Sequence, residues 1–275
     1  MKKVGSQMIG FAFAGLIIFL SSIYAAFAQQ TPSAEELAKK LANPVAALIS
    51  VPFQLNYDGD IGPADEGERW TLNLQPVVPI SLNEDWNLIS RTIVPLVDQK
   101  DIFPGAGSQS GVGDILQSLF FSPVAPTASG WIWGAGPALL FPTGSDDLLT
   151  GDKWAAGPSV VMLKQEGPWT YGALVNHIWS YAGEDDRRDI NASFLQPFVT
   201  YTTPGAVSMT LQTEATYDWE SEQWSVPVFG VVSKVFNFGG QLVSIGGGVK
   251  YYADTTDGGP EDWGARVVVT FLFPK

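Results

Sequence analysis

His177 is the single histidine of the chain, and the sequence contains no cysteine. Zinc sites use three or four protein ligands, drawn mainly from cysteine and histidine, so this composition argues against a zinc site. The lack of cysteine also excludes disulfides and suits an oxidising compartment. The remaining catalytic option is a serine nucleophile that His177 activates from a neighbouring element at the same depth. No local motif marks such a serine, so we predict no catalytic residues, no metal and no cofactor.

Four charged residues stand in the middle of largely uncharged stretches: Arg91, Glu214, Lys250 and Arg266. An unpaired charge that faces lipid at the centre of a bilayer costs about 2 to 4 kcal/mol. If these stretches cross a membrane, the four side chains must therefore point into a shared interior. Two roles stay open for them: a polar lining that selects solutes, or a salt-bridge network that braces a narrow lumen. Three of the four are basic, so the set predicts excess positive charge, which favours anionic or neutral solutes.

The stretches that carry these residues alternate between polar and apolar side chains. Between residues 208 and 219 the even positions are polar and the odd positions are mostly apolar, and residues 49–57 and 263–273 alternate in the same way. A period of two residues predicts strands with one polar and one apolar face. After the N-terminus, no uninterrupted apolar run approaches the roughly 18 residues of a transmembrane helix. Strands are thus the elements that must carry the apolar surface.

We count twelve alternating segments, most of them about as long as a tilted strand that crosses a bilayer. They predict an all-β fold, a transmembrane antiparallel up-and-down β-barrel of about twelve strands within residues 44–275. The alternation does not decide which face meets lipid in the third, fourth, sixth, seventh and tenth segments. The predicted strands are 45–57, 69–80, 86–97, 111–121, 131–141, 156–164, 169–180, 191–201, 207–217, 224–236, 241–252 and 263–273.

The predicted connections alternate between long and short, and 21 of the 28 acidic residues lie in the long set. Bacterial outer-membrane barrels have short periplasmic turns and long external loops, so the alternation predicts the bacterial outer membrane. The acidic loops could bind divalent cations that bridge lipopolysaccharide, but they contain no twelve-residue calcium loop, and we interpret them as solvated charge. The long set is 58–68, 98–110, 142–155, 181–190, 218–223 and 253–262, and the short set is 81–85, 122–130, 165–168, 202–206 and 237–240.

The aromatic residues support the same interpretation. Nearly all of the ten tryptophans lie within a few residues of a predicted strand end. Tryptophan favours the boundary between headgroups and hydrocarbon and forms girdles around such barrels. The alternating aromatic finish Phe271-Leu272-Phe273 resembles the C-terminal signal that the outer-membrane assembly machinery reads, although Pro274 and Lys275 follow it.

The N-terminus has the features of a secretory signal peptide. Lys2 and Lys3 precede an apolar run from residue 9 to residue 24, and Ala26-Phe27-Ala28 matches a small-x-small cleavage site. A membrane anchor is the alternative, but a run of about 15 residues is short for a spanning helix. We therefore assign residues 1–28 to a signal peptide. Residues 29–43 carry capping-box spacing at Ser33 and Glu36, which predicts a short helix, either periplasmic or folded into the barrel mouth as a plug.

Short motifs across the mature chain resemble a bacterial outer-membrane transporter family. This family is labelled "MetA-pathway of phenol degradation", and its members are sometimes misnamed neuromedin U. The motifs are NPV (43–45), LISVPFQ (48–54), LQPVVP (74–79), GVGD (111–114), FFSP (120–123), GP (136–137), FPTG (141–144), GPW (167–169), NHIWS (176–180), QPF (196–198), VSKVF (232–236) and KYY (250–252).

The resemblance implies an outer-membrane barrel that transports small aromatic or hydrophobic compounds, with no catalytic residues to carry over. We expect an outer-membrane channel or transporter, and the alternative is a barrel with a structural or phospholipase-like role. The expected partners are outer-membrane lipids and lipopolysaccharide, a small-molecule solute and the outer-membrane assembly machinery. The net charge of −13 argues against a nucleic-acid partner, which needs clustered basic residues.

Overall fold

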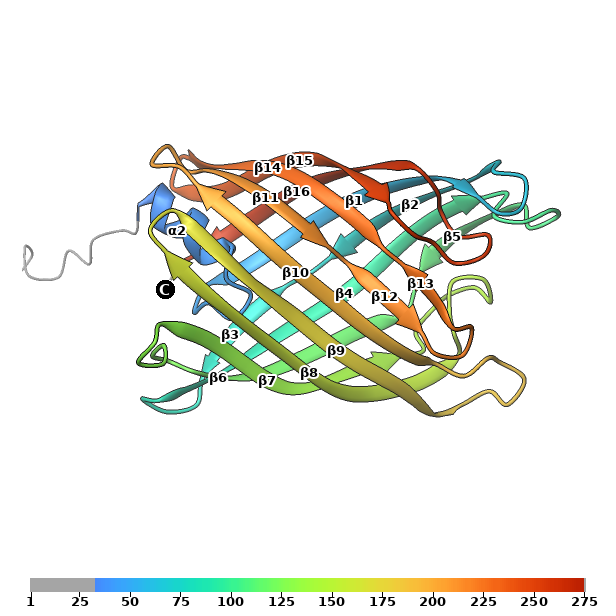
Figure 1. Ribbon diagram of the computed structural model, residues 1–275, viewed down its shortest axis with the longest axis horizontal. Helices are drawn as coiled ribbons and strands as arrows, with labels where there is room; N and C mark the ends of the chain where they lie inside the picture. The colour runs from blue at the N-terminus through green and yellow to red at the C-terminus, as the bar shows by residue number, and fades with distance from the viewer. Residues whose placement is uncertain (1–32, 275) are drawn as a thin grey trace, which may run out of the picture. The chain divides into compact units, whose positions relative to one another are not determined.

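The computed structural model describes residues 33–274. The predicted signal peptide, residues 1–28, and the first residues of the 29–43 segment lie outside this range. One helix, α2 (Ala34–Leu41), precedes a closed antiparallel sheet (Figure 1). Its strands are β1 (Ile49–Ile61), β2 (Gly67–Leu74), β3 (Val77–Ser81), β4 (Trp86–Lys100), β5 (Ser108–Val112), β6 (Ile115–Pro123), β7 (Trp131–Phe141), β8 (Lys153–Glu166), β9 (Trp169–Gly183), β10 (Asn191–Thr202), β11 (Val207–Thr213), β12 (Ala215–Asp218), β13 (Gln223–Ser225), β14 (Pro227–Phe238), β15 (Gln241–Tyr252) and β16 (Trp263–Phe273).

The sheet closes where the first strand pairs with the last. In this pairing Ile49 lies opposite Phe273 and Tyr57 lies opposite Ala265. The remaining pairings all join passes of the chain that follow one another in sequence, as in an up-and-down barrel. The sixteen strands form twelve passes, because β2 and β3, β5 and β6, β11 and β12, and β13 and β14 each belong to one interrupted pass. The predicted transmembrane barrel of about twelve antiparallel strands is therefore confirmed.

Two of the interruptions carry polar side chains of the lumen. Between β2 and β3, Pro76 has no N–H to donate to a neighbouring strand, and the Gln75 N–H bonds to the Pro52 carbonyl at 2.9 Å. Between β11 and β12, the Glu214 N–H bonds to the Pro227 carbonyl at 3.2 Å. Gln75 and Glu214 both line the lumen, as do the alternate residues Asn73 and Val77 and Gln212 and Thr216 on either side, so the inward alternation continues through both interruptions.

The outer wall of the barrel is apolar. Met209, Leu211, Val232 and Val267 each expose 45% to 56% of their surface, whereas the adjacent inward Ser208 exposes 7%. This arrangement inverts that of a water-soluble protein and suits a wall that faces lipid. The tryptophans form two groups near the strand ends, Trp70, Trp154, Trp179, Trp219, Trp224 and Trp263 at the end with the long connections and Trp86, Trp131, Trp133 and Trp169 at the other.

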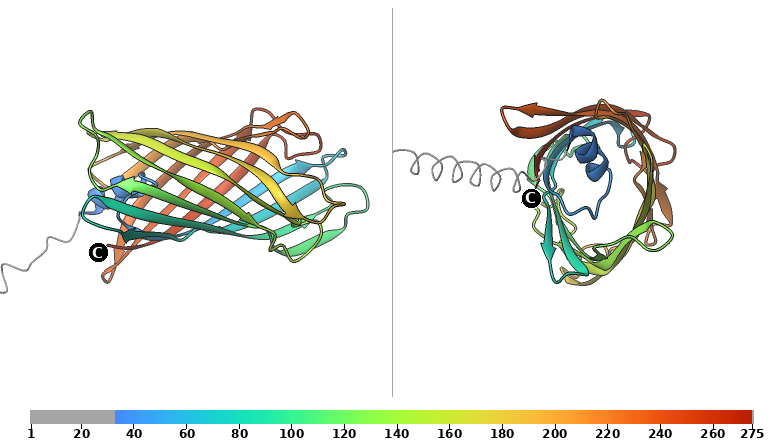
Figure 2. Two further views of the ribbon diagram at one scale, coloured as in Figure 1. Left: turned by 90° about the horizontal axis from the view of Figure 1, so that it is seen from below. Right: turned by 90° about the vertical axis from the view of Figure 1, so that its left-hand side faces the viewer.

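Helix α2 lies inside the ring of strands at the short-turn end of the barrel (Figure 2, right). Its Leu37 and Ala38 are buried, and they pack against inward residues from the barrel wall, including Val235 and Leu272. The Gln165 side chain donates to the Lys39 carbonyl at 2.8 Å. No helix in residues 33–274 has the length and hydropathy to span a membrane.

The chain after α2 continues along the lumen. Its contacts explain why the alternation did not decide which face of five predicted segments meets lipid. Val45 is buried in a cluster whose wall residues are Ile89, Phe120, Val161, Leu163 and Leu174. These five residues lie on the third, fourth, sixth and seventh predicted segments, and they point inward although they are apolar. On the tenth predicted segment, Val235 packs in the α2 cluster and Phe229 packs against lumen cations. Both faces of these strands are apolar because the outer face meets lipid and the inner face packs against α2, the chain that follows it, or the lumen cations.

Candidate functional site

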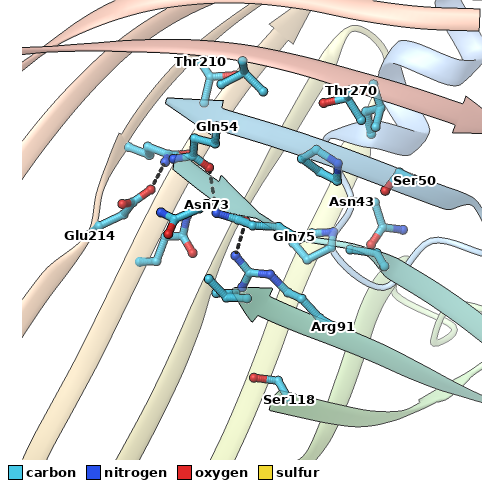
Figure 3. Close-up of a pocket in the computed structure, with 18 of the residues that line it drawn as sticks. Asn43, Ser50, Gln54, Asn73, Gln75, Arg91, Ser118, Thr210, Glu214 and Thr270 are labelled. Atoms are coloured by element: carbon cyan, nitrogen blue, oxygen red, sulfur yellow. Dashed lines mark hydrogen bonds between the residues drawn. The ribbon is translucent and has the colours of Figure 1, made fainter. Parts of the chain in front are cut away.

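The lumen contains a chamber of about 550 Å³. The chain from Leu41 to Leu48 forms its boundary toward the short turns, and charged residues from the middle of the barrel form another part of its wall. Its lining combines polar side chains, such as Gln54, Gln75 and Gln212, with apolar ones, such as Ile93, Leu116 and Phe194. Figure 3 shows Arg91, Gln54, Gln75 and Glu214 turned toward this space. Ligand cavities of a few hundred cubic ångströms with mixed lining accommodate small organic molecules.

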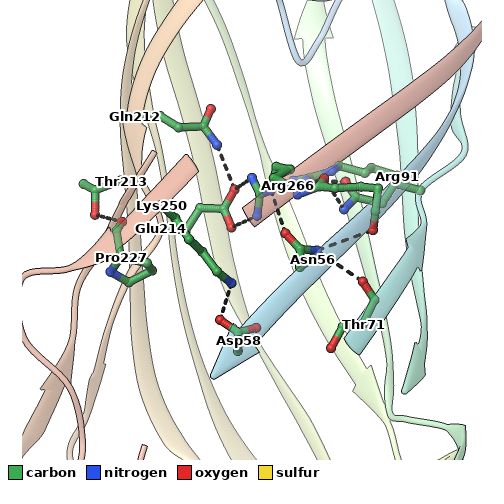
Figure 4. A network of polar contacts seen from close by, with 12 residues as sticks. Asn56, Asp58, Thr71, Arg91, Gln212, Thr213, Glu214, Pro227, Lys250 and Arg266 are labelled. Atoms are coloured by element: carbon green, nitrogen blue, oxygen red, sulfur yellow. Dashed lines mark hydrogen bonds and ion pairs between the residues drawn. The ribbon is translucent and has the colours of Figure 1, made fainter. Parts of the chain in front are cut away.

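Arg266 and Glu214 form a two-point ion pair at the edge of the chamber (Figure 4). Arg266 Nη1 donates to Glu214 Oε1 at 2.6 Å and Nη2 donates to Oε2 at 2.9 Å, while Nε donates to Asn56 Oδ1 at 2.7 Å. The guanidinium lies 3.8 Å from the centre of the Phe229 ring. Arg266 exposes only 6% of its surface, so this geometry fixes the side chain in the lumen.

Lys250 pairs with Asp58, to which Tyr252 also donates a hydrogen bond at 2.6 Å. The predicted position of Asp58 in a solvated loop is wrong, because β1 continues to Ile61 and buries Asp58 in the lumen. The expectation that a single acid faces three bases fails for the same reason. Lys250 and Arg266 each have their own carboxylate, and Lys250 lies outside the lining of the chamber.

Arg91 differs from the other predicted lumen cations. Its Nη2 contacts the side-chain amide of Gln75 at 3.2 Å, and within residues 33–274 it has no carboxylate at ion-pair distance. The structure therefore brings Arg91, Glu214 and Arg266 together at the chamber and places all four predicted residues in the lumen. Their role in selecting solutes stays a prediction. Sequence analysis missed Gln54, Gln75 and Asn56, although Gln54 and Asn56 occupy polar positions of the first alternating segment.

His177 lies on the outer wall and not in the lumen. It shares its face of β9 with Val175 and Trp179, which expose 43% and 48% of their surface. On the adjacent strand Ser193 lies directly opposite, and its Oγ is 2.8 Å from His177 Nδ1. Trp219 Nε1 donates to the same Oγ at 2.9 Å. Ser193 is thus the serine at hydrogen-bond distance from His177. The register of β9 with β10 places it there, and no sequence motif marks it.

Hydrogen bonds hold two loops in place at the end of the barrel with the long connections. The Asp114 carboxylate accepts from the N–H groups of Thr143, Gly144 and Gly151 and from the Thr150 hydroxyl, at 2.7 to 3.1 Å. These bonds fix the 142–152 connection against the strand break at residues 113 and 114.

The 184–190 connection is anchored through Asp189. Hydrogen bonds from Lys153 and Ser180 lower the pKa of Asp189 below its usual value. In the described part of the chain, no group of three or more acidic or histidine residues is placed to hold a metal ion.

The barrel resembles solved outer-membrane proteins at low sequence identity. It matches the COG4313 outer membrane channel from Pseudomonas putida F1 with a TM-score of 0.66 and 15% identity, over 82% of this chain and 96% of that one. It matches the NanC porin with a TM-score of 0.50 and 11% identity, over 82% and 100%. Outer membrane phospholipase A from Escherichia coli follows with a TM-score of 0.49 and 11% identity, over 82% and 90%.

No family model and no curated protein sequence matches the chain. At 15% and 11% identity, the structural similarities establish the fold alone. The barrel that the sequence resemblance implied is therefore confirmed. The family label "MetA-pathway of phenol degradation" is not, and it stays a prediction.

Proposed function

We propose that this chain is a channel of the bacterial outer membrane for small solutes that carry an apolar portion. The chamber in the lumen is the observation that carries the proposal. Apolar side chains such as Ile93, Leu116 and Phe194 share its lining with Arg91 and Glu214. A water-filled pore for ions and sugars needs no apolar lining at its centre, whereas a path for amphipathic molecules does.

The lumen is narrow and has two obstacles along its length. Helix α2 and the residues that follow it occupy the short-turn end, and the ion pair of Arg266 with Glu214 crosses part of the middle. A solute that passes through must contact the chamber wall. We therefore propose a channel that recognises its solutes, with transport of aromatic or hydrophobic compounds as the specific form of the proposal.

Transport assays on purified protein test this function. Proteoliposomes that contain the full mature chain should take up a radiolabelled aromatic compound such as benzoate faster than empty liposomes do. Sucrose should enter much more slowly, because the narrowed lumen admits large hydrophilic solutes poorly. Equal rates with and without protein, for every small solute tried, would remove the channel proposal.

The proposed orientation places the long connections outside the cell. Asp186→Cys, in the 184–190 connection, should react with a membrane-impermeant maleimide on intact cells. Gly205→Cys, in the short 203–206 turn, should react only after the outer membrane is opened. Both positions are exposed, so accessibility within the protein does not separate them. Labelling of Gly205→Cys on intact cells contradicts this orientation.

The proposed partners follow from the same placement. The apolar wall meets outer-membrane lipids, and the loop end meets lipopolysaccharide. The strand β16, which ends in Phe271-Leu272-Phe273, is the proposed contact with the assembly machinery.

A second candidate function is hydrolysis of a lipid ester by Ser193 and His177. The 2.8 Å contact favours it, because a serine nucleophile needs a base at hydrogen-bond distance. It ranks second because a catalytic histidine also needs a group that orients its other nitrogen. Within residues 33–274, the His177 ring has no hydrogen-bond partner besides Ser193. We expect no labelling of wild-type protein by a fluorophosphonate, and labelling that Ser193→Ala abolishes would promote the hydrolase.

A further inference from the structure

The charged groups around the chamber do not balance. Glu214 binds Arg266 through both of its oxygens, and Asp58 binds Lys250 and Tyr252. Both of these carboxylates are therefore engaged, and neither lies at ion-pair distance from Arg91. An unpaired cation in a confined, partly apolar space attracts an anion, since the surroundings weaken its solvation.

Two amide side chains connect Arg91 with Arg266. The end of the Gln54 amide that faces Arg266 lies 2.6 to 2.8 Å from its guanidinium nitrogens. The other end of Gln54 meets Gln75 at 2.9 Å, and Gln75 meets Arg91 at 3.2 Å (Figure 3). The order along the lumen is therefore guanidinium, amide, amide, guanidinium.

Such a series cannot satisfy all three of its contacts. A guanidinium only donates hydrogen bonds, whereas a primary amide has an accepting oxygen at one side and a donating nitrogen at the other. If Gln54 turns its oxygen toward Arg266, its nitrogen donates to the Gln75 oxygen, and the Gln75 nitrogen then faces Arg91. If both amides reverse, Arg91 gains an acceptor and Arg266 faces an N–H group. If each amide turns its oxygen toward its own arginine, both guanidiniums meet an oxygen, but the nitrogens of the two amides face each other. At least one of the three contacts is therefore always between two donors.

The distances decide which of the three contacts is the one between two donors. The contacts of Gln54 with Arg266, at 2.6 to 2.8 Å, and with Gln75, at 2.9 Å, are both shorter than the 3.2 Å contact of Gln75 with Arg91. The two shorter contacts therefore each join a donor to an acceptor, with the oxygen of Gln54 at Arg266. The weaker contact at Arg91 then becomes the donor–donor one. An acceptor that enters the chamber beside Arg91 removes this mismatch and also supplies the missing negative charge.

We infer that Arg91 is the binding site for the carboxylate of a small amphipathic solute whose apolar body lies in the chamber. This inference rests on the proposed channel function and deepens it by naming the solute class. A carboxylate offers two acceptor oxygens that match the fork of a guanidinium. Ile93, Leu116 and Phe194 provide apolar surface in the same chamber for an aromatic ring or short alkyl chain. The volume of about 550 Å³ is ample for a single-ring acid.

Calorimetry with a matched pair of probes tests the site. Benzoate and benzamide have nearly the same shape and differ in the charge of one group, and each is titrated into the full mature chain in lipid nanodiscs. Wild-type protein should bind benzoate at least about tenfold more tightly than benzamide, because charge-assisted hydrogen bonds exceed neutral ones by about that factor. Arg91→Gln should remove the difference and leave the affinity for benzamide nearly unchanged.

A second variant tests the same site without removing the arginine. Ser118 lies directly opposite Arg91 on the adjacent strand and also lines the chamber. Ser118→Asp places a carboxylate beside Arg91, so it should abolish the preference for benzoate while the barrel keeps its heat-modifiable migration on gels. Arg69→Gln is the matched control, because Arg69 bonds to Gln99 and lies outside the chamber lining. It should bind both probes as wild-type protein does.

The outcomes separate this inference from the channel proposal. Equal affinity for the two probes in wild-type protein, or a benzoate preference that survives both Arg91→Gln and Ser118→Asp, overturns the Arg91 site. Either result, together with solute uptake by proteoliposomes, leaves the channel standing. Arg91-dependent benzoate binding in a protein without any uptake keeps the site and removes the channel.

Discussion

The two obstructions of the lumen are built from opposite kinds of contact. At the short-turn end, α2 is held by apolar packing of Leu37 and Ala38 against the wall. In the middle, Arg266 and Lys250 meet carboxylates within hydrogen-bonding distance. Apolar packing is non-directional and insensitive to moderate salt, whereas ion pairs depend on charge and on geometry. We therefore expect the helix to control passage at the short-turn end and the ion pairs to influence which charge passes the middle.

The largest expected effect comes from the apolar obstruction. Leu37→Asp places an unpaired carboxylate among Val235, Leu242 and Leu272, which is strongly unfavourable, so the helix should leave the lumen. Single-channel conductance in planar bilayers should then rise severalfold. Ala34→Asp is the matched control, since Ala34 is exposed at the first position of the helix. Equal conductance in wild-type protein and Leu37→Asp would show that α2 does not limit the path.

The next largest effect is on ion selectivity, and it should have opposite signs for the two kinds of substitution in the ionic obstruction. Replacing both Arg266 and Lys250 by Gln leaves Glu214 and Asp58 without their partners, so the lumen should shift toward cations. Glu214→Gln leaves Arg266 without its carboxylate, so the lumen should shift toward anions. Reversal potentials in a potassium chloride gradient measure both shifts. Shifts of the same sign, or none, would mean that these side chains do not line the ion path.

The comparison also shows what the sequence could predict. The segments 131–141, 241–252 and 263–273 match β7, β15 and β16 in both bounds, because turn residues such as Gly130, Pro142 and Gly240 flank them. The first segment is displaced to 49–61, since Asp58-Gly59-Asp60 has the composition of a loop. Asp58 is tolerated inside only because Lys250 and Tyr252 arrive from another strand. The alternation places a residue on a face, but it does not supply the partner across the lumen.

The apolar packing inside the lumen could not be predicted either, because it joins segments that are far apart in the sequence. Ile89, Phe120 and Leu163 belong to segments whose faces the alternation leaves undecided. Their inner faces are apolar because Val45 packs there, and no single segment contains that information. Ser193 presents the same difficulty on the outer wall, where only the register of β9 with β10 brings it to His177. Predictions made strand by strand recover the barrel and miss contacts between distant segments.

No effect on solute uptake is expected from a substitution on the outer wall, far from both obstructions. Replacing His177 by Ala should leave solute uptake unchanged, because His177 faces outward beside Trp179 and contacts no lumen residue. Uptake of labelled benzoate by proteoliposomes measures this, with Leu37→Asp as the positive control for altered transport. A clear loss of uptake in His177→Ala would indicate that solutes approach the channel along the outer wall.

The smallest expected effect is a pH response of the 184–190 connection. Because the hydrogen bonds from Lys153 and Ser180 hold the pKa of Asp189 below its usual value, the folded connection favours the charged carboxylate. The stabilisation is therefore present above the ordinary aspartate pKa of about 4 and is lost as the pH falls through the lower value in the folded protein. A bimane fluorophore on Asp186→Cys should report a constant environment from pH 8 to pH 5 and greater mobility below about pH 4.

Adding Asp189→Asn should give the mobile signal throughout and reduce the acid step, since Lys153 then has no carboxylate to bind. An unchanged acid step in the double variant would assign it to the other acids of this connection, Glu184, Asp185 or the remaining carboxylates nearby.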